Sequence, residues 1–168
     1  RSHNVGPDSL MRILIMGNSG SGKSHRARAL AAQHGLVHLD LDTIVWEPGK
    51  IAVPRTPDQV RAELLDFVTC NDAWVAEGCY GDLVEAALPH CSELVFMNPG
   101  RAVCLENNRR RPWEPHKYAS MDAQQSKLNF LLEWVSAYYE REDAMSYACH
   151  RRVFDEFGGP KTEVTLLG

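Results

Sequence analysis

The sequence of 168 residues has no excess of positive charge, because 22 acidic residues outnumber 18 Lys and Arg and give a formal net charge of -4. Proteins that bind nucleic acid broadly usually carry a basic surface, so this balance disfavours that class. No apolar run approaches the ~20 residues of a membrane-spanning helix. The first ten residues also lack the apolar segment of a secretory signal. We therefore expect neither a membrane protein nor a secreted one.

The cysteines lack the spacings that would indicate a zinc site or a C-x-x-C redox motif. There are five of them, Cys70, Cys79, Cys91, Cys104 and Cys149. We interpret them as small hydrophobic residues kept reduced in the cytoplasm. The length suits a single domain, which we place at residues 11–168. Residues 1–10 resemble a cloning remnant, with Met11 as the natural start.

The most informative motif is a complete G-x-x-x-x-G-K-[ST] (Walker A) loop. It consists of Gly17, Asn18, Ser19, Gly20, Ser21, Gly22, Lys23 and Ser24, followed by His25. Its backbone N–H groups cradle phosphates, its lysine reaches the β- and γ-phosphates, and its serine hydroxyl binds Mg²⁺. The apolar run 11–16 predicts a strand before the loop, and 22–34 predicts a helix opened by it. This context favours a nucleotide site that includes all nine residues.

Strand and helix patterns alternate along the rest of the chain. Further strands are predicted at 36–39, 73–76, 93–97 and 163–167. Helices are predicted at about 57–70, 100–110 and 122–157, with a proline-broken stretch at 112–118. This alternation predicts an α/β fold, a five-stranded parallel sheet sandwiched by helices. Ligands of such sheets bind beyond the carboxyl ends of the strands, so function should lie after strands one, two and three.

Three carboxylates follow the second and third predicted strands. Asp40 and Asp42 are spaced i, i+2 and therefore point to the same side, and Glu77 ends the third strand before Gly78. We predict that Ser24, Asp40 and Glu77 organise Mg²⁺ and that Asp42 accepts a proton from a substrate hydroxyl. The alternatives are an Asx turn or helix cap for the aspartates and a cap of Gly78 for the glutamate.

Three consecutive arginines, Arg109, Arg110 and Arg111, lie at the end of the third predicted helix, directly before the proline-broken stretch. Basic residues at a helix C-terminus complement its dipole, which is one interpretation. The other is a small lid that swings over the phosphates and neutralises the transferred phosphoryl group. We predict that Arg109 or Arg110 makes this contact and leave open which one.

Together, Gly17 to Ser24, Asp40, Asp42, Trp46 and the run Glu77-Gly78-Cys79-Tyr80 resemble the small P-loop kinases of the adenylate and shikimate kinase group. The pattern is most similar to bacterial adenylate-kinase-related, "topology modulation" proteins. The resemblance implies a P-loop NTPase fold, ATP and Mg²⁺ as cofactors, and Asp42 at the acceptor hydroxyl. No Gly-Gly-Gly follows strand three as in shikimate kinases, and no Arg follows Gly78 as in adenylate kinases. Neither acceptor is therefore implied.

The resulting hypothesis is a cytoplasmic ATP-dependent phosphotransferase, with Lys23, Asp42, Glu77 and the arginines as catalytic residues. Its partners would be ATP and an unidentified small-molecule acceptor, and the protein would be a monomer or homodimer. A module that binds ATP or hydrolyses it slowly, without an acceptor, is the alternative. A nucleic-acid-directed modification is a third, disfavoured by the negative charge.

Overall fold

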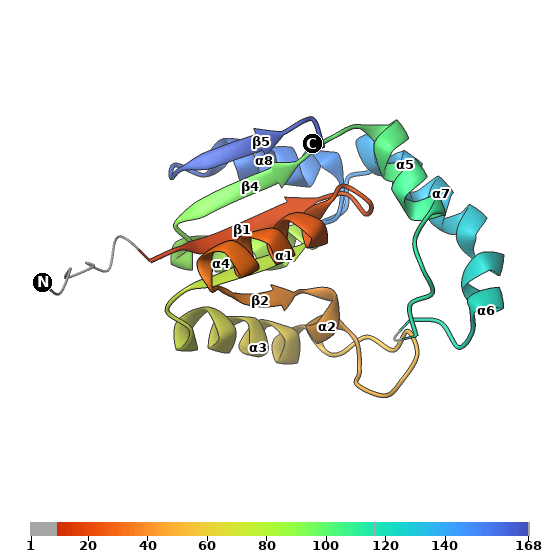
Figure 1. Ribbon diagram of the computed structural model, residues 1–168, viewed down its shortest axis with the longest axis horizontal. Helices are drawn as coiled ribbons and strands as arrows, with labels where there is room; N and C mark the ends of the chain where they lie inside the picture. Colours follow the sequence, from red (N-terminus) through yellow and green to blue (C-terminus); the bar gives the residue numbers. More distant parts are fainter. Residues whose placement is uncertain (1–9, 116, 168) are drawn as a thin grey trace, which may run out of the picture.

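The computed structural model describes residues 10–115 and 117–167, and these fold around one parallel sheet (Figure 1). In chain order the strands are β1 (Arg12–Gly17), β2 (Val37–Asp40), β3 (Trp74–Gly78), β4 (Glu93–Met97) and β5 (Lys161–Val164). Their order in the sheet is β2-β3-β1-β4-β5, and every neighbouring pair is parallel. The predicted five-stranded parallel sheet is confirmed. Apart from residue 10, the predicted cloning remnant lies outside the described residues.

Helices cover both faces of the sheet and one of its ends. They are α1 (Lys23–His34), α2 (Asp42–Val45), α3 (Pro57–Cys70), α4 (Gly81–Ala87), α5 (Arg101–Arg109), α6 (Met121–Ser126), α7 (Leu128–Ser136) and α8 (Tyr147–Glu156), with short 3₁₀ turns η2 (Leu88–His90) and η3 (Ala137–Tyr139). Helix α1 packs on one face, whereas α4 and α8 pack on the other. Helices α5 and α7 lie side by side beyond the carboxyl ends of the strands.

The central strand β1 shows why this arrangement is stable. Ile13 and Ile15 belong to the apolar cluster under α1, and Leu14 and Met16 belong to the cluster under α3, α4 and α8. All four side chains are at most 1% exposed. Successive residues of a strand point to opposite faces, so a strand that is apolar at every position requires cover on both sides. This is the doubly covered sheet that the sequence predicted.

Local signals placed some elements at their observed bounds. Helix α3 begins where Thr56 forms a capping box with Gln59 and Pro57 occupies the first turn. The cap satisfies backbone N–H groups that would otherwise lack partners, and proline at this position costs no hydrogen bond. The predicted helix 57–70 and the predicted strand 93–97 are both confirmed.

Two predicted elements were wrong in their bounds. The stretch 122–157 is not one helix but α6, α7, η3 and α8, because side chains compete with the helical backbone near its middle. Asp143 accepts a hydrogen bond from the Met145 N–H at 2.8 Å, and the Ser146 hydroxyl caps α8. The last strand is Lys161–Val164 rather than 163–167. Leu166 and Leu167 lie past the sheet, and Leu166 is 84% exposed.

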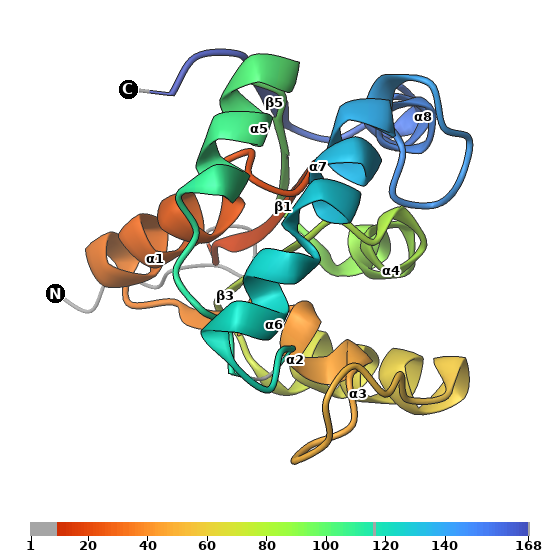
Figure 2. The ribbon, with the colours of Figure 1, turned by 90° about the vertical axis from the view of Figure 1, so that its right-hand side faces the viewer.

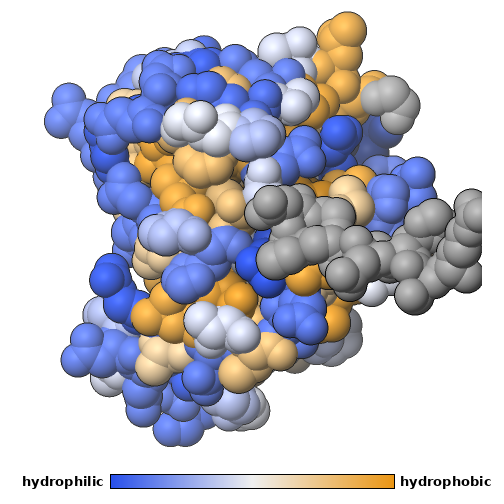
Figure 3. Space-filling view, turned by 90° about the vertical axis from the view of Figure 1, so that its left-hand side faces the viewer, coloured by the Kyte–Doolittle hydropathy of each residue, from blue (hydrophilic) through white to orange (hydrophobic). Residues whose placement is uncertain are grey.

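The carboxyl ends of the strands face α5, α6 and α7, and the link between α5 and α6 runs across this end toward α2 (Figure 2). At the opposite end, hydrophobic side chains form separate patches among hydrophilic ones (Figure 3). None of the helices in the described part of the chain combines the length and apolar character that crossing a bilayer requires.

Candidate active site

The glycine-rich loop joins β1 to α1 in a tight turn that its glycines allow. Gly20 and Gly22 have φ values of 81° and 93°, in the left-handed region that glycine adopts without a steric cost. The loop closes on itself through a hydrogen bond from the Ser21 N–H to the Asn18 carbonyl. Lys23 donates from Nζ to the same carbonyl at 2.6 Å, so its ammonium lies inside the curl of the loop.

Helices α5 and α7 hold the loop from outside, and the sequence did not predict this support. Asn108 is 2% exposed. Its amide nitrogen donates to the Ser19 carbonyl at 3.0 Å, and its amide oxygen accepts from the Ser19 hydroxyl at 3.0 Å. Asn107 donates to the Gly20 carbonyl at 2.8 Å, and Asn18 donates to the Val135 carbonyl of α7. Helices α5 and α7 therefore hold the loop in place.

Asp40 and Glu77 end neighbouring strands in register, next to the loop. Glu77 is 1% exposed, and its Oε2 has no hydrogen-bond partner among the described residues. Burial, and then the charge of Asp40, raises the pKa of Glu77, while Lys23 and a hydrogen bond from Ser24 oppose the shift. One oxygen of Asp40 accepts from the Asp42 N–H at 2.9 Å, so the Asx turn of the alternative interpretation is present. Its other oxygen is not used by that turn.

These oxygens fit a Mg²⁺ site completed by a ligand. A buried carboxylate oxygen without a partner costs free energy, and a hard cation would satisfy it. The described residues contain no group of three or more His, Cys, Asp or Glu able to hold a metal alone. Mg²⁺ is usually bound through one or two carboxylates together with substrate phosphates and water. Ser24, Asp40 and Glu77 are thus a suitable donor set only with a nucleotide present.

Asp42 lies on the β2 side of the site with both carboxylate oxygens occupied. The Tyr80 hydroxyl donates to Oδ1 at 2.6 Å, and Lys117 Nζ donates to Oδ2 at 3.1 Å. Burial acts to raise the pKa of Asp42, but the Lys117 charge, these hydrogen bonds and the Lys23 charge outweigh it and lower the pKa. The carboxylate is therefore ionised at neutral pH. Sequence reasoning did not single out Lys117 or Tyr80 as its partners, because nothing local connects them.

A cavity of about 650 Å³ opens beside the loop on the β4–β5 side. One part of its wall is polar and basic, formed by Lys23, Ser24, His25, Arg26, Arg110 and Arg111. Another part is apolar, formed by Ala29, Met97, Pro112, Val164, Leu166 and Leu167. The size falls within the ~300–1,000 Å³ range of small-molecule sites. A charged end beside the phosphate loop and an apolar end suit the phosphates and the base of a nucleotide.

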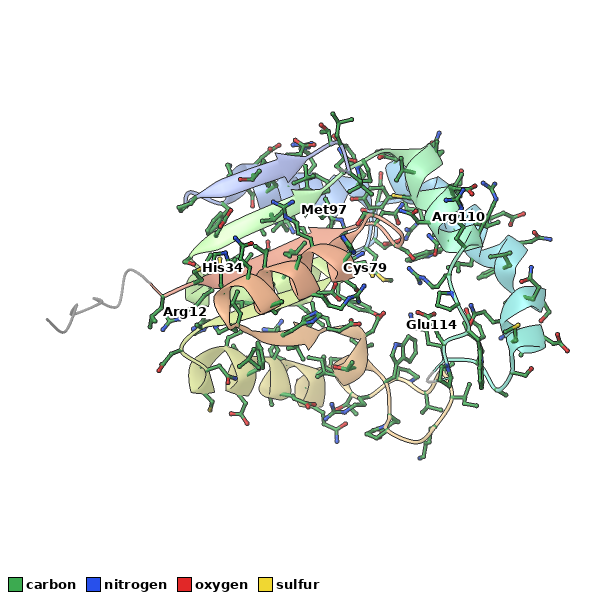
Figure 4. The ribbon with its side chains drawn as sticks, viewed as in Figure 1. Arg12, His34, Cys79, Met97, Arg110 and Glu114 are labelled. Atoms are coloured by element: carbon green, nitrogen blue, oxygen red, sulfur yellow. The ribbon has the colours of Figure 1, made fainter. Side chains whose placement is uncertain are left out.

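The three consecutive arginines divide into two that pair with Glu106 and one that contacts the phosphate loop. Arg109 and Arg110 form ion pairs with Glu106 at 3.6 and 2.8 Å, and both side chains are more than half exposed. Arg110 nevertheless lines the cavity, whereas Arg109 does not. Arg111 donates to the Ser19 hydroxyl at 3.4 Å and is only 27% exposed. Of the three, Arg111 makes the direct contact with the phosphate loop, and Figure 4 shows Arg110 at the end of α5.

The sheet order, the loop between β1 and α1, and the flanking helices define a P-loop kinase fold, and solved structures agree. A gluconokinase from Sinorhizobium meliloti 1021 is 22% identical, with a TM-score of 0.50 over 94% of this chain and 84% of that chain. A sugar kinase from Janibacter sp. HTCC2649, unliganded, is 17% identical, with a TM-score of 0.51 over 94% and 87%.

The resemblance to the P-loop kinases is thus confirmed for the fold. Neither family models nor curated proteins match the sequence. The fold hosts several chemistries, so the function must be argued from the site itself.

Proposed function

We propose that the protein is an ATP-dependent phosphotransferase that transfers the γ-phosphoryl group to the hydroxyl of a small-molecule acceptor. One juxtaposition carries the proposal. The phosphate loop with Lys23 lies between a nucleotide-sized cavity on one side and the ionised Asp42 on the other. An ATP in the cavity would present its γ-phosphate toward Asp42, which can accept the proton of an acceptor hydroxyl.

The residues around the loop would supply positioning and charge. Loop N–H groups and Lys23 would bind the β- and γ-phosphates, and His25 would border the nucleotide at the first turn of α1. Ser24, with Asp40 and Glu77, would hold Mg²⁺, which when bound neutralises phosphate charge. Arg110 and Arg111 would cover the phosphates, with Arg109 outside them. Positioning and electrostatics carry most of the rate enhancement in phosphoryl transfer, and these residues would supply both kinds of contribution.

We further propose that the segment from about Arg109 to Tyr118, of which residue 116 lies outside the described residues, acts as a small lid. The segment connects the two sides of the site through Arg111 at Ser19 and Lys117 at Asp42. Closing over both substrates would exclude water, which would otherwise compete with the acceptor for the phosphoryl group. The adenylate-kinase-related group remains the proposed closest branch, and the cytoplasm, where ATP is abundant, the proposed location.

The test is formation of ADP that depends on an acceptor. The purified protein is incubated with γ-labelled ATP and Mg²⁺ against pools of small hydroxylated metabolites, and any labelled product is identified by mass. Lys23→Ala is the matched control, because it removes the charge on the γ-phosphate, a loss of several kcal/mol at the transition state, and leaves the loop backbone able to form. A pool-dependent rate that Lys23→Ala abolishes supports the proposal.

The alternative, a module that only binds ATP or hydrolyses it slowly, predicts something different. Its rate of ADP release would be the same with every pool and with water alone. Turnover that persists in Lys23→Ala, with an unchanged circular dichroism spectrum, would contradict both versions of the site.

A further inference from the structure

A continuous series of charged contacts links the two sides of the site. Arg111 Nη2 lies 3.4 Å from the Ser19 hydroxyl of the phosphate loop. Arg111 Nη1 lies 3.7 Å from Glu114 Oε1, and Lys117 Nζ lies 3.8 Å from Glu114 Oε2. Lys117 Nζ is also 3.1 Å from Asp42 Oδ2. One carboxylate therefore stands between the cation at the nucleotide side and the cation at the acceptor side.

Glu114 is held in place while its two partners are long and flexible. Its backbone N–H donates to Gln124 Oε1 at 2.7 Å, and Gln124 donates in turn to the Pro112 carbonyl at 3.0 Å. Helix α6 thus fixes the backbone on either side of residue 113. Figure 4 shows Glu114 on the link between α5 and α6, across from Cys79 near the end of β3. The backbone of Glu114 is therefore held in place, and its carboxylate can attract either Arg111 or Lys117.

The distances leave room for the contacts to redistribute. Both ion pairs of Glu114 are longer than the ~2.7–2.9 Å of a strong charge-assisted hydrogen bond, so each can tighten at the expense of the other. Exposed fractions of 27% for Arg111, 22% for Glu114 and 20% for Lys117 mean that water screens these charges only in part. A change in charge near Arg111 therefore alters the electrostatic attraction on Lys117.

We propose that Glu114 is a positioning residue that couples nucleotide binding to the release of Asp42; the inference rests on the proposed phosphotransferase function. Without nucleotide, Lys117 pairs with Asp42 and occupies its Oδ2. Phosphates on the loop attract Arg111 away from Glu114. Glu114 then attracts Lys117 more strongly, and Asp42 Oδ2 becomes available to an acceptor hydroxyl. The acceptor site is thereby completed only when the phosphoryl donor is in place.

The coupling has a consequence that needs no knowledge of the acceptor. Coupling free energies are reciprocal: if nucleotide weakens the Lys117–Asp42 pair, then removal of the Asp42 charge must strengthen nucleotide binding through Glu114. In Asp42→Asn, Lys117 is already free to pair with Glu114, and Arg111 is already released toward the phosphates. Asp42→Asn should therefore bind a nonhydrolysable ATP analogue more tightly than the unmodified protein.

The experiment is a double-mutant cycle measured by calorimetry with that analogue and Mg²⁺. Four proteins are compared: the unmodified chain, Asp42→Asn, Glu114→Gln and the double variant. Direct repulsion between Asp42 and the phosphates is the same in both backgrounds and cancels in the cycle. We expect the gain in affinity from Asp42→Asn to be at least about twofold larger when Glu114 is intact. Glu114→Asp, which keeps the charge, should restore part of the difference.

Controls separate coupling from a merely structural effect. Glu140→Gln breaks the surface ion pair with Arg101, outside the series, and should leave the gain from Asp42→Asn unchanged. Lys117→Gln removes the cation that lies between Asp42 and Glu114 and should abolish the coupling as Glu114→Gln does. The coupling would be overturned if all four proteins bound the analogue tightly and Asp42→Asn gave the same gain in affinity with Glu114 intact as in the Glu114→Gln background. That result would leave the proposed function intact. No binding of the analogue by the unmodified protein would overturn both.

Discussion

The packing of the phosphate loop against α5 can be tested by giving one glycine a methyl group. A Cβ on Gly20 would lie 2.5 Å from both Asn108 Nδ2 and the Cys104 carbonyl, contacts too short to persist. Gly20 also has a φ of 81°, which disfavours alanine by about 1–2 kcal/mol. Gly35 offers a matched control, because its φ is 67° but a Cβ there would meet nothing within 4 Å.

We expect Gly35→Ala to lower the free energy of unfolding by about 1–2 kcal/mol, from the backbone alone. Gly20→Ala should lower it by a further ~1–3 kcal/mol, because α5 or the loop must move to accommodate the methyl group. Urea denaturation measures both values, and calorimetry with a nonhydrolysable ATP analogue should show weakened binding only for Gly20→Ala. Equal destabilisation and unchanged binding in both variants would refute the claim that α5 fixes the loop.

Three further predictions concern the proposed magnesium ligands, the arginines and a buried histidine. Glu77→Gln keeps the shape of the side chain and should raise the Mg²⁺ concentration needed for half-maximal turnover more than it weakens nucleotide binding; an unchanged titration would return Glu77 to a capping role. Arg111→Ala should lower turnover at saturating ATP by about tenfold or more and Arg109→Ala by far less, so equal rates would argue against the Arg111 contact. Burial lowers the pKa of His150 from 6.5 to about 4. Between these pH values the unfolded chain binds a proton that the folded chain does not. The free energy of unfolding should therefore fall by up to about 3 kcal/mol as the pH drops from 6.5 to 4. His150→Gln should lack this part of the pH dependence in urea titrations.

The sheet and the loop were predictable because their signals are local. The Walker A spacing and the apolar run 11–16 each act within a few residues, and each specifies its own backbone geometry. The same locality explains the errors. The period of 122–157 is helical throughout, but the turn that breaks it depends on the side chain of Asp143, which a periodic pattern does not register.

The supports of the candidate site were not predictable, because they join residues distant in sequence. Asn108 contacts Ser19 across 89 positions, and Lys117 contacts Asp42 across 75. No sequence pattern predicts such partners for an asparagine inside a helix or for a lysine in a proline-rich link. Sequence reasoning therefore predicted the loop and the carboxylates beside it, but not the contacts that hold the loop or the lysine that pairs with Asp42.

The strand order explains why the link between α5 and α6 can couple the two sides of the candidate site. Strand β1 carries the phosphate loop, with β3 and then β2 on one side and β4 and β5 on the other. The cavity lies toward β4 and β5, and Asp42 follows β2, so in the proposed reaction a phosphoryl group would cross the ends of the central strands. The link leaves α5, which follows β4, and reaches Asp42 through Lys117. The link therefore spans the same path, and Glu114 on it lies near both Arg111, beside the loop, and Lys117, beside Asp42.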